Sequence, residues 1–465
     1  MTTALDVARA ALAGQRAWLV GGSVRDRLLG RPAADDVDLV IEGDVERAAR
    51  ALARAGHAAA FPLSEAYGAW RVTAPGDAWQ GDLMPLAGAS IEEDLRRRDF
   101  TINALAEPLG GGEIVDPEGG VGDLQARRLR MVSPDAFDDD PLRVMRLARL
   151  ACELELAPDG DTIVAAQARA PRLAEVAPER VFAELRRLLC APAVVDGLRL
   201  MERVGVTAVV LPEVAALRGV PQSRFHHLDA YEHTLAVLGE LIELERDPAA
   251  AFGEHGEALA RVLAEPLAHE LTRGQALRLG ALLHDIAKPA TRAVAPDGRI
   301  TFLGHDDIGA QQSRAVLTRM RTSERLRAHV AALTRHHLRL GFLVHERPLA
   351  PRAVHAYLRA CEPVEVDVTV LSVADRLATR GDHAETAITA HLDLARELLG
   401  AALRWRDEGP PPPLLRGDEL AAAMDQTPGP GLGGLLAELE AAHYAGEVVT
   451  REDALAWARA RARGR

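Results

Sequence analysis

Residues 19–26 read LVGGSVRD and residues 36–38 read DVD, and these two stretches decide the fold at the start of the chain. The apolar run of residues 17–20 stops at a pair of glycines, which predicts a strand that enters a tight turn, with a helix from Ser23. Acidic and aliphatic residues alternate up to Ile41, as is typical of a second strand, and helical spacing follows. The pattern predicts a small α/β domain.

The glycines and the aspartates are candidates for phosphate chemistry. Gly21 and Gly22 would stand before a helix N-terminus, where backbone N–H groups favour a phosphate, although a tight strand-to-helix turn needs such glycines as well. Asp36 and Asp38 would point to the same side of a strand and could hold a metal ion. Because Mg²⁺ prefers oxygen ligands and keeps substrate phosphates, the combination predicts phosphoryl or nucleotidyl transfer. Asp82 is either a third carboxylate on a neighbouring strand or a turn residue.

Two arginine clusters follow, RRRDFTINA at residues 96–104 and DDPLRVMRLAR at residues 139–149. The second cluster places three arginines on one broad face of a helix that starts near Pro141: Arg143, Arg146 and Arg149. Arginines beside a metal–triphosphate site can neutralise developing charge. The alternative is a salt-bridged surface helix whose positive end is capped by the two aspartates before it.

The composition sets limits on the class of protein. The chain has 465 residues, 48% of them hydrophobic and 26% charged, which excludes a disordered chain and a lone small module. Its net charge of −13 has the wrong sign for coating nucleic acid, so any such contact must come from local arginine clusters. Three scattered cysteines, no signal pattern and no long apolar stretch predict a cytoplasmic protein that does not enter a membrane.

The pattern divides the chain into four parts. Residues 1–127 form the α/β head, and residues 128–218 read as a helical neck and body. Fifteen of the sixteen histidines follow position 225, so residues 219–408 carry a second chemistry. Consecutive prolines open residues 409–465, which predicts a stiff linker and a short helical tail.

The motifs of the head resemble those of the bacterial tRNA nucleotidyltransferases, the family of CCA-adding enzymes and poly(A) polymerases. GGSVRD, DVD, RRRDFTINALA, DDPLRVMRLARLA and ERVFAEL stand in the family's order, from residue 21 to residue 185. The resemblance implies a nucleotidyltransferase head related to polymerase β. It also implies tRNA as the partner and CTP and ATP as substrates.

The resemblance also implies a role for each matching residue. Gly21, Gly22 and Arg25 would hold the triphosphate. The DVD aspartates, with Asp82 as the third carboxylate, would bind two Mg²⁺ ions that activate the tRNA 3′-hydroxyl and steady the leaving pyrophosphate.

Further along the chain, Arg98 and Asp99 would contact the ribose of the incoming nucleotide. Asp140 and Arg143 match the pair that reads the base, since C and A both present an amino donor beside a ring-nitrogen acceptor. Two arginines match further nucleotide contacts: Arg146 and Arg149.

One departure from the family concerns which nucleotides are added. CCA-adding members carry a flexible loop between the third carboxylate and the RRD motif, whereas here residues 82–90 run almost directly into residues 91–96. Such a deletion resembles the enzymes that add only the two cytidines. The sequence therefore favours CC addition and leaves full CCA addition open. Residues 63–71 do not match the basic-aromatic signature of the poly(A) polymerases, which makes that activity a minor alternative.

The histidine-rich part resembles the HD phosphohydrolase superfamily. His233, the His284-Asp285 pair and Asp375 match the residues that bind a metal there, either Mg²⁺ or a divalent transition metal. A second metal would add His305 and one of two neighbours, His336 or His337. The resemblance implies an all-α HD domain, with Lys288 near a substrate phosphate, that hydrolyses phosphate esters.

Two other classes of protein remain as alternatives. The chain could be primarily an HD phosphohydrolase whose head only binds a nucleotide, but the intact head motifs weigh against this. A non-catalytic tRNA-binding protein would need neither metal constellation.

Overall fold

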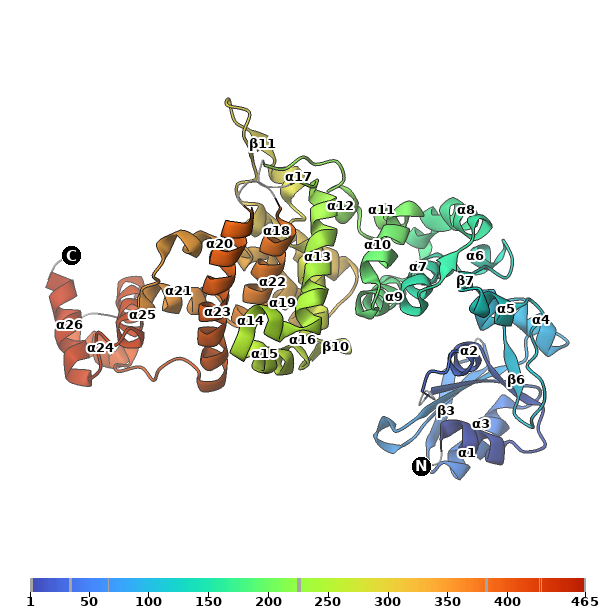
Figure 1. The fold of residues 1–465 in the computed structure, drawn as a ribbon. Helices are drawn as coiled ribbons and strands as arrows, with labels where there is room; N and C mark the ends of the chain where they lie inside the picture. The colour runs from blue at the N-terminus through green and yellow to red at the C-terminus, as the bar shows by residue number, and fades with distance from the viewer. Residues whose placement is uncertain are drawn as a thin grey trace. The chain divides into compact units, whose positions relative to one another are not determined.

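The computed structural model describes residues 3–32, 36–65, 67–223, 227–380, 384–425, 427 and 429–463. The chain divides into two compact units between Val210 and Leu211, and the two are described separately (Figure 1). No helix among the described residues is both long and apolar enough to cross a membrane.

A six-stranded mixed sheet forms the base of the first unit, in the order β3-β4-β5-β2-β1-β6. Neighbouring strands run antiparallel, except β2 and β5, which are parallel. This confirms the predicted α/β head, and the sheet is mixed. The strands are β1 (Ala17–Val20), β2 (Asp36–Ile41), β3 (Ala59–Ser64), β4 (Ala69–Thr73), β5 (Gln80–Pro85) and β6 (Ala106–Pro108).

The two faces of this sheet differ. One face carries buried Val37 and Leu39 and packs against α1 (Ala4–Ala11) and α3 (Val45–Ala55). On the other face, Val40 joins an apolar cluster that includes Leu95 of α4 (Ile91–Leu95). The aspartates of β2 lie on this second face, where strand alternation leaves them exposed.

The turn after β1 forms as the glycine pair predicts, but the helix begins one residue earlier than expected, because α2 spans Gly22–Leu28. Beyond the sheet, short helices α5 (Gly120–Gln125) and α6 (Ala136–Asp139) lead to the neck. Its main helices are α7 (Leu142–Leu154), α8 (Gly160–Arg169), α9 (Pro178–Cys190), α10 (Val194–Arg203) and α11 (Val206–Val210).

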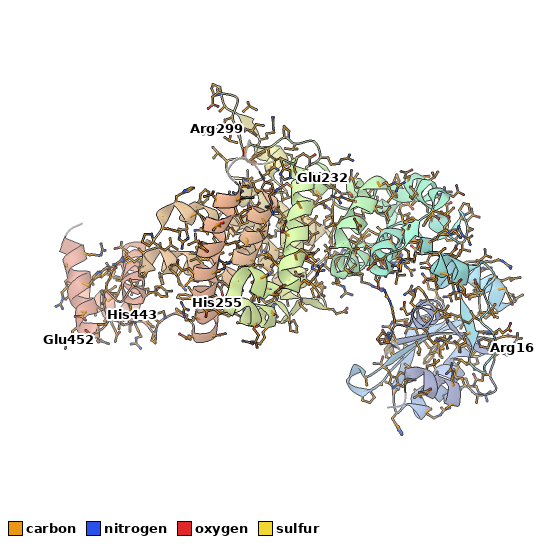
Figure 2. The ribbon with its side chains drawn as sticks, viewed as in Figure 1. Arg16, Glu232, His255, Arg299, His443 and Glu452 are labelled. Atoms are coloured by element: carbon orange, nitrogen blue, oxygen red, sulfur yellow. The ribbon has the colours of Figure 1, made fainter. Side chains whose placement is uncertain are left out.

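Helices dominate the second unit (Figure 2). The larger ones are α13 (Ala230–Arg246), α16 (Arg273–Leu283), α18 (His305–Arg319), α19 (Glu324–His336), α21 (Pro351–Cys361), α22 (Glu365–Ala378) and α23 (Ala384–Glu408). Two short antiparallel ladders interrupt them: β9 (Pro266–Ala268) with β10 (Leu271–Thr272), and β11 (Ala293–Val294) with β12 (Ile300–Thr301). Residues 247–272 form short helices and the first of these ladders, and their sequence predicts no role for them.

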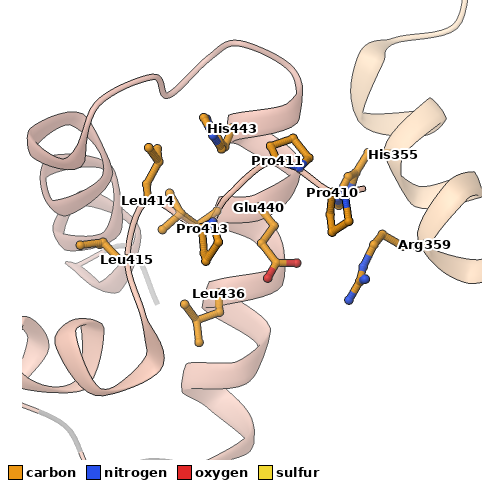
Figure 3. Close-up of a pocket in the computed structure, with 11 residues that line it drawn as sticks. His355, Arg359, Pro410, Pro411, Pro413, Leu414, Leu415, Leu436, Glu440 and His443 are labelled. Carbon is orange, nitrogen blue, oxygen red and sulfur yellow. The ribbon is translucent and has the colours of Figure 1, made fainter. Parts of the chain in front are cut away.

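The proline-rich segment links α23 to a tail of helices α24 (Gly417–Met424), α25 (Pro430–Tyr444) and α26 (Arg451–Arg463). Its prolines lie between α21 and α25, around a cavity of about 90 Å³ lined also by His355, Arg359, Glu440 and His443 (Figure 3). The tail has an apolar core of its own, which includes Leu420, Leu435 and Ala454.

Two glycines of α5 give a matched test of the head's packing. A Cβ on Gly120 would lie 2.1 Å from the Thr101 carbonyl oxygen, whereas a Cβ on Gly122 would meet nothing within 4 Å. We expect Gly120→Ala to destabilise the head by roughly 1–3 kcal/mol. Gly122→Ala should stabilise it by about 0.5–1 kcal/mol, because alanine restricts the unfolded chain and favours helix. Urea unfolding of the full chain measures both. A Gly120→Ala variant as stable as wild type would contradict the packing described.

Candidate active site and metal centre

The strand register brings three carboxylates together in the head. In the parallel pair of β2 and β5, Asp38 is the direct partner of Asp82, and Asp36 is the partner of Gln80. Asp82 is therefore a strand residue and not a turn residue. Its carboxylate accepts two hydrogen bonds of 2.7 Å from the guanidinium of Arg71 on β4.

A cavity of about 390 Å³ opens beside the aspartates of β2. It is lined by ten of the residues predicted from the sequence: Gly21, Gly22, Arg25, Asp36, Asp38, Arg98, Asp99, Arg143, Arg146 and Arg149. Four more residues that the sequence did not single out complete the wall: Ser23, Asp26, Asn103 and Arg187. Six arginines against four aspartates favour an anionic ligand.

The surroundings of Asp38 disfavour its charged carboxylate. Although the side chain keeps access to solvent, the surrounding protein and the nearby carboxylates of Asp82 and Asp36 raise the pKa of Asp38. Bound cations would offset that repulsion, which fits a metal site between Asp36 and Asp38.

The glycine turn depends on close approach. Gly21 has φ 66° and ψ −128°, a conformation that side chains disfavour. A Cβ there would also lie 2.9 Å from Nη1 of Arg98. Gly21 therefore lets the arginine of the RRD motif lie directly against the turn at the start of α2.

A chain of polar contacts crosses the floor of the cavity. Nη1 of Arg25 donates to Oδ1 of Asn103 over 2.6 Å, and Nδ2 of Asn103 donates to Oδ1 of Asp99 over 3.0 Å. Nη2 of Arg146 lies 3.0 Å from Oδ2 of Asp99. Although burial alone would raise it, these contacts lower the pKa of Asp99. Asn103 lies inside the RRRDFTINALA stretch, and its place in that motif is the sequence feature that could have marked it as a site residue.

Asp140 and Arg143 do not pair with each other through their side chains. Oδ2 of Asp140 accepts a hydrogen bond of 2.7 Å from Nη2 of Arg180 at the start of α9. The guanidinium of Arg143 donates instead to the backbone carbonyls of Arg97, over 2.8 Å, and Ala136, over 3.0 Å. Asp140 also does not line the cavity as described. Arg180 lies in the ERVFAEL stretch, and the sequence predicts no individual role for it.

Arg149 is the most buried of the helix arginines. Its guanidinium lies 2.5 Å from Glu184 and also contacts Glu153. Arg187 lies on α9, one turn after Glu184. Its guanidinium is 3.3 Å from Glu153, and it lines the cavity. The acids of the neck therefore hold Arg149 and Arg187 close together despite their like charge.

In the second unit, six of the predicted histidines and aspartates form two adjoining groups. His233, His284 and Asp375 make one group, and Asp285, His305 and His337 make the other, with ligand atoms within 4.8 Å of one another in each. His233 lies at the end of α13 that Glu232 marks in Figure 2. Its Nε2 atom is 3.0 Å from Oδ1 of Asp375.

The imidazoles are oriented for metal binding. Nδ1 of His284, His305 and His337 lies 2.6–2.8 Å from a backbone carbonyl of the same local turn. A carbonyl can only accept, so each Nδ1 donates, and Nε2 keeps the lone pair that a metal requires. Burial and the neighbouring His284 lower the pKa of His337 to about 4, which keeps that ring neutral. The donor set therefore fits divalent metal.

His336 lies outside this centre, because consecutive residues at the end of a helix point in different directions. Nδ1 of His336 accepts a hydrogen bond of 2.9 Å from Arg339. Lys288 is buried, with Nζ 2.5 Å from Oδ2 of Asp285 and 2.5 Å from Oε1 of Gln222. Although burial alone would raise it, His284 and Lys288 hold the pKa of Asp285 well below its usual range.

Family models match three parts of the chain. A model of the poly A polymerase head domain matches residues 17–78 and 65–130, and one for a probable RNA and SrmB-binding site of polymerase A matches residues 156–217. An HD domain model matches residues 230–380.

Two curated relatives match almost the full length. The A-adding tRNA nucleotidyltransferase of Deinococcus radiodurans is 38% identical over 95% of this chain and 94% of its own. The CC-adding tRNA nucleotidyltransferase of Thermus thermophilus is 37% identical over 95% of this chain and 92% of its own. A solved structure of a CCA-adding enzyme with ATP shares the fold, with a TM-score of 0.64 at 18% identity over 98% of this chain and 95% of its own.

The neighbouring histidines give a matched test of the metal centre. His337→Ala removes one ligand of the second group, so divalent metal should bind the centre roughly tenfold more weakly or worse. His336→Ala should leave the affinity unchanged, since that ring faces Arg339. Mn²⁺ titration, with Asp36→Asn and Asp38→Asn present in every sample to silence the head, measures both. Equal losses in the two variants would contradict the assignment.

Proposed function

Because the chain belongs to the tRNA nucleotidyltransferase family, we propose that it transfers CMP from CTP to the 3′ end of tRNA and stops after two additions. The observation that carries the proposal is the pair of aspartates on β2, Asp36 and Asp38, at the edge of an arginine-lined cavity that begins at a helix N-terminus. Carboxylates for a metal and arginines for a triphosphate are what nucleotidyl transfer requires.

Each part of the head then has a task. Asp36 and Asp38 would hold Mg²⁺, which supplies charge stabilisation for the attacking and leaving oxygens when it is bound. The backbone N–H groups at Gly21 and Gly22 and the guanidinium of Arg25 would hold the triphosphate. Asp82 would be the third carboxylate. It lies on the neighbouring strand β5, where Arg71 holds its carboxylate next to Asp38.

Recognition of the base would depend on Asp140 and Arg143. Arg180 holds the carboxylate of Asp140 as an acceptor, which is the group needed by the exocyclic amino group of cytosine. Arg143 is held by backbone carbonyls of α6 and the RRD motif, and it would donate to the ring nitrogen of the base. Arg98 and Asp99 would contact the ribose, and Arg146 and Arg149 would complete the nucleotide site.

The restriction to two cytidines rests on the connection between β5 and α4. Only Leu86 to Ser90 join Pro85 to Ile91, which leaves no room for the flexible loop of the CCA-adding members. The A-adding and CC-adding relatives are almost equally similar to this chain, so overall identity does not choose between them. The short connection favours CC addition.

We also propose that the HD centre hydrolyses phosphate esters. His233, His284, Asp285 and Asp375, joined by His305 and His337, would hold one or two divalent ions, and Lys288 would contact the phosphate.

In this arrangement residues 1–127 are the catalytic head, residues 128–218 read the base and bind tRNA, residues 219–408 are the HD domain, and residues 409–465 form the linker and tail. The thiols of Cys152, Cys190 and Cys361 fit a reducing cytoplasm.

Separate variants of the two sites test this division. Asp36→Asn with Asp38→Asn should abolish incorporation of labelled CMP into tRNA that lacks its 3′ CCA, because no carboxylate pair remains for the metal. Hydrolysis of p-nitrophenyl phosphate should be unchanged. His284→Ala with Asp285→Asn should lose that hydrolysis and keep CMP transfer. Loss of both activities in either double variant would overturn the two-site account.

A further inference from the structure

The head exposes a group of large apolar side chains on the strands that follow β2 in the sheet. Phe61 and Leu63 of β3 are each 43% exposed, Met84 of β5 is 39% exposed, and Tyr67 in the turn between β3 and β4 is 73% exposed. Exposed side chains of this size that gather at one place commonly mark a binding surface. We call Phe61, Leu63, Tyr67 and Met84 the apolar strip.

The strand register connects the strip to the catalytic aspartates. Asp38 is the direct partner of Asp82, Asp82 is the partner of Arg71, and Arg71 is the partner of Phe61. Direct cross-strand partners lie on the same face of a sheet. Three steps between strands place Phe61 about 14 Å from Asp38 on that face.

The nucleotide cavity occupies the opposite side of the aspartates. Its lining residues come from the turn after β1, from α2 and β2, from the RRD region and from the neck helices, and none of them belongs to β3, β4 or β5. In an in-line displacement the attacking and leaving groups stand on opposite sides of the reacting phosphorus. The attacking 3′-hydroxyl therefore has its open approach over β5, β4 and β3.

The strip offers stacking surfaces next to a charge that is already paired. Arg71, the cross-strand partner of both Asp82 and Phe61, forms an ion pair with Asp82. Phe61 also borders an open groove of about 660 Å³, but the arginines of that groove, Arg50 and Arg54, belong to α3 on the opposite face of the sheet. Apolar and aromatic side chains on which bases stack are a common means of binding a single strand.

We propose that the apolar strip binds the single-stranded 3′ end of the tRNA and delivers its terminal hydroxyl to Asp36 and Asp38. The bases lie on Phe61 and its neighbours. The strip takes any base, because every base has a face that stacks. This inference rests on the proposed transfer to tRNA and adds the surface that holds the acceptor strand.

Steady-state kinetics on tRNA without its 3′ CCA test the proposal. Phe61→Ala should raise KM for tRNA by about tenfold, as expected from the loss of one stacked base, and should leave KM for CTP and kcat close to wild type. Phe61→Tyr should restore KM for tRNA because it keeps the ring. Leu28→Ala is the matched control, since Leu28 is 41% exposed at the far end of α2.

Fluorescence anisotropy of labelled tRNA without CTP gives a second measurement that does not depend on turnover. An unchanged affinity in Phe61→Ala and Met84→Ala would overturn the proposal, and so would an equal rise in KM for tRNA and CTP. A concentration-dependent dimer that Phe61→Ala dissociates, with KM for tRNA unchanged, would assign the strip to a second copy of the chain. A wild-type protein that adds no CMP would refute the proposed function instead.

Discussion

Charge balance around a few carboxylates is the constraint on which the head depends. The parallel pairing of β2 and β5 sets Asp38 directly beside Asp82, and the two carboxylates repel each other. On the β4 side, Arg71 compensates this repulsion by donating a hydrogen bond to each carboxylate oxygen of Asp82. On the other side Asp38 keeps a raised pKa and an open face. A bound cation would compensate the remaining negative charge of Asp38, which lines the cavity.

The arginines of the cavity are held by the reverse arrangement. Arg98 is paired with Asp94, Arg146 with Asp99, and Arg149 with Glu184, so each of these guanidinium groups lines the cavity next to an acid. This keeps several cations within one site without mutual expulsion. In the HD centre, backbone carbonyls orient three imidazole rings and leave their Nε2 atoms available for a divalent metal.

Much of this could be predicted from the sequence, because the decisive contacts are local. A two-residue spacing places Asp36 and Asp38 on one face, and the glycine pair requires a turn before α2. The partner of Asp140 could not be predicted, since Arg180 comes from another helix and the pairing depends on how α7 and α9 pack. The choice of His337 over His336 depends likewise on the direction in which α19 ends. Asn103 stands inside a quoted motif, but its bridge between Arg25 and Asp99 exists only in the folded head.

The most direct test of the central claim is extension of a tRNA without its 3′ CCA, resolved to single nucleotides, with Mg²⁺ and CTP alone, ATP alone, or both. We predict that products stop two nucleotides on, even with both triphosphates present, because Leu86 to Ser90 stand where CCA-adding members have a flexible loop. A third nucleotide that appears when ATP is added would contradict the restriction to CC and show that the short connection supports adenylation.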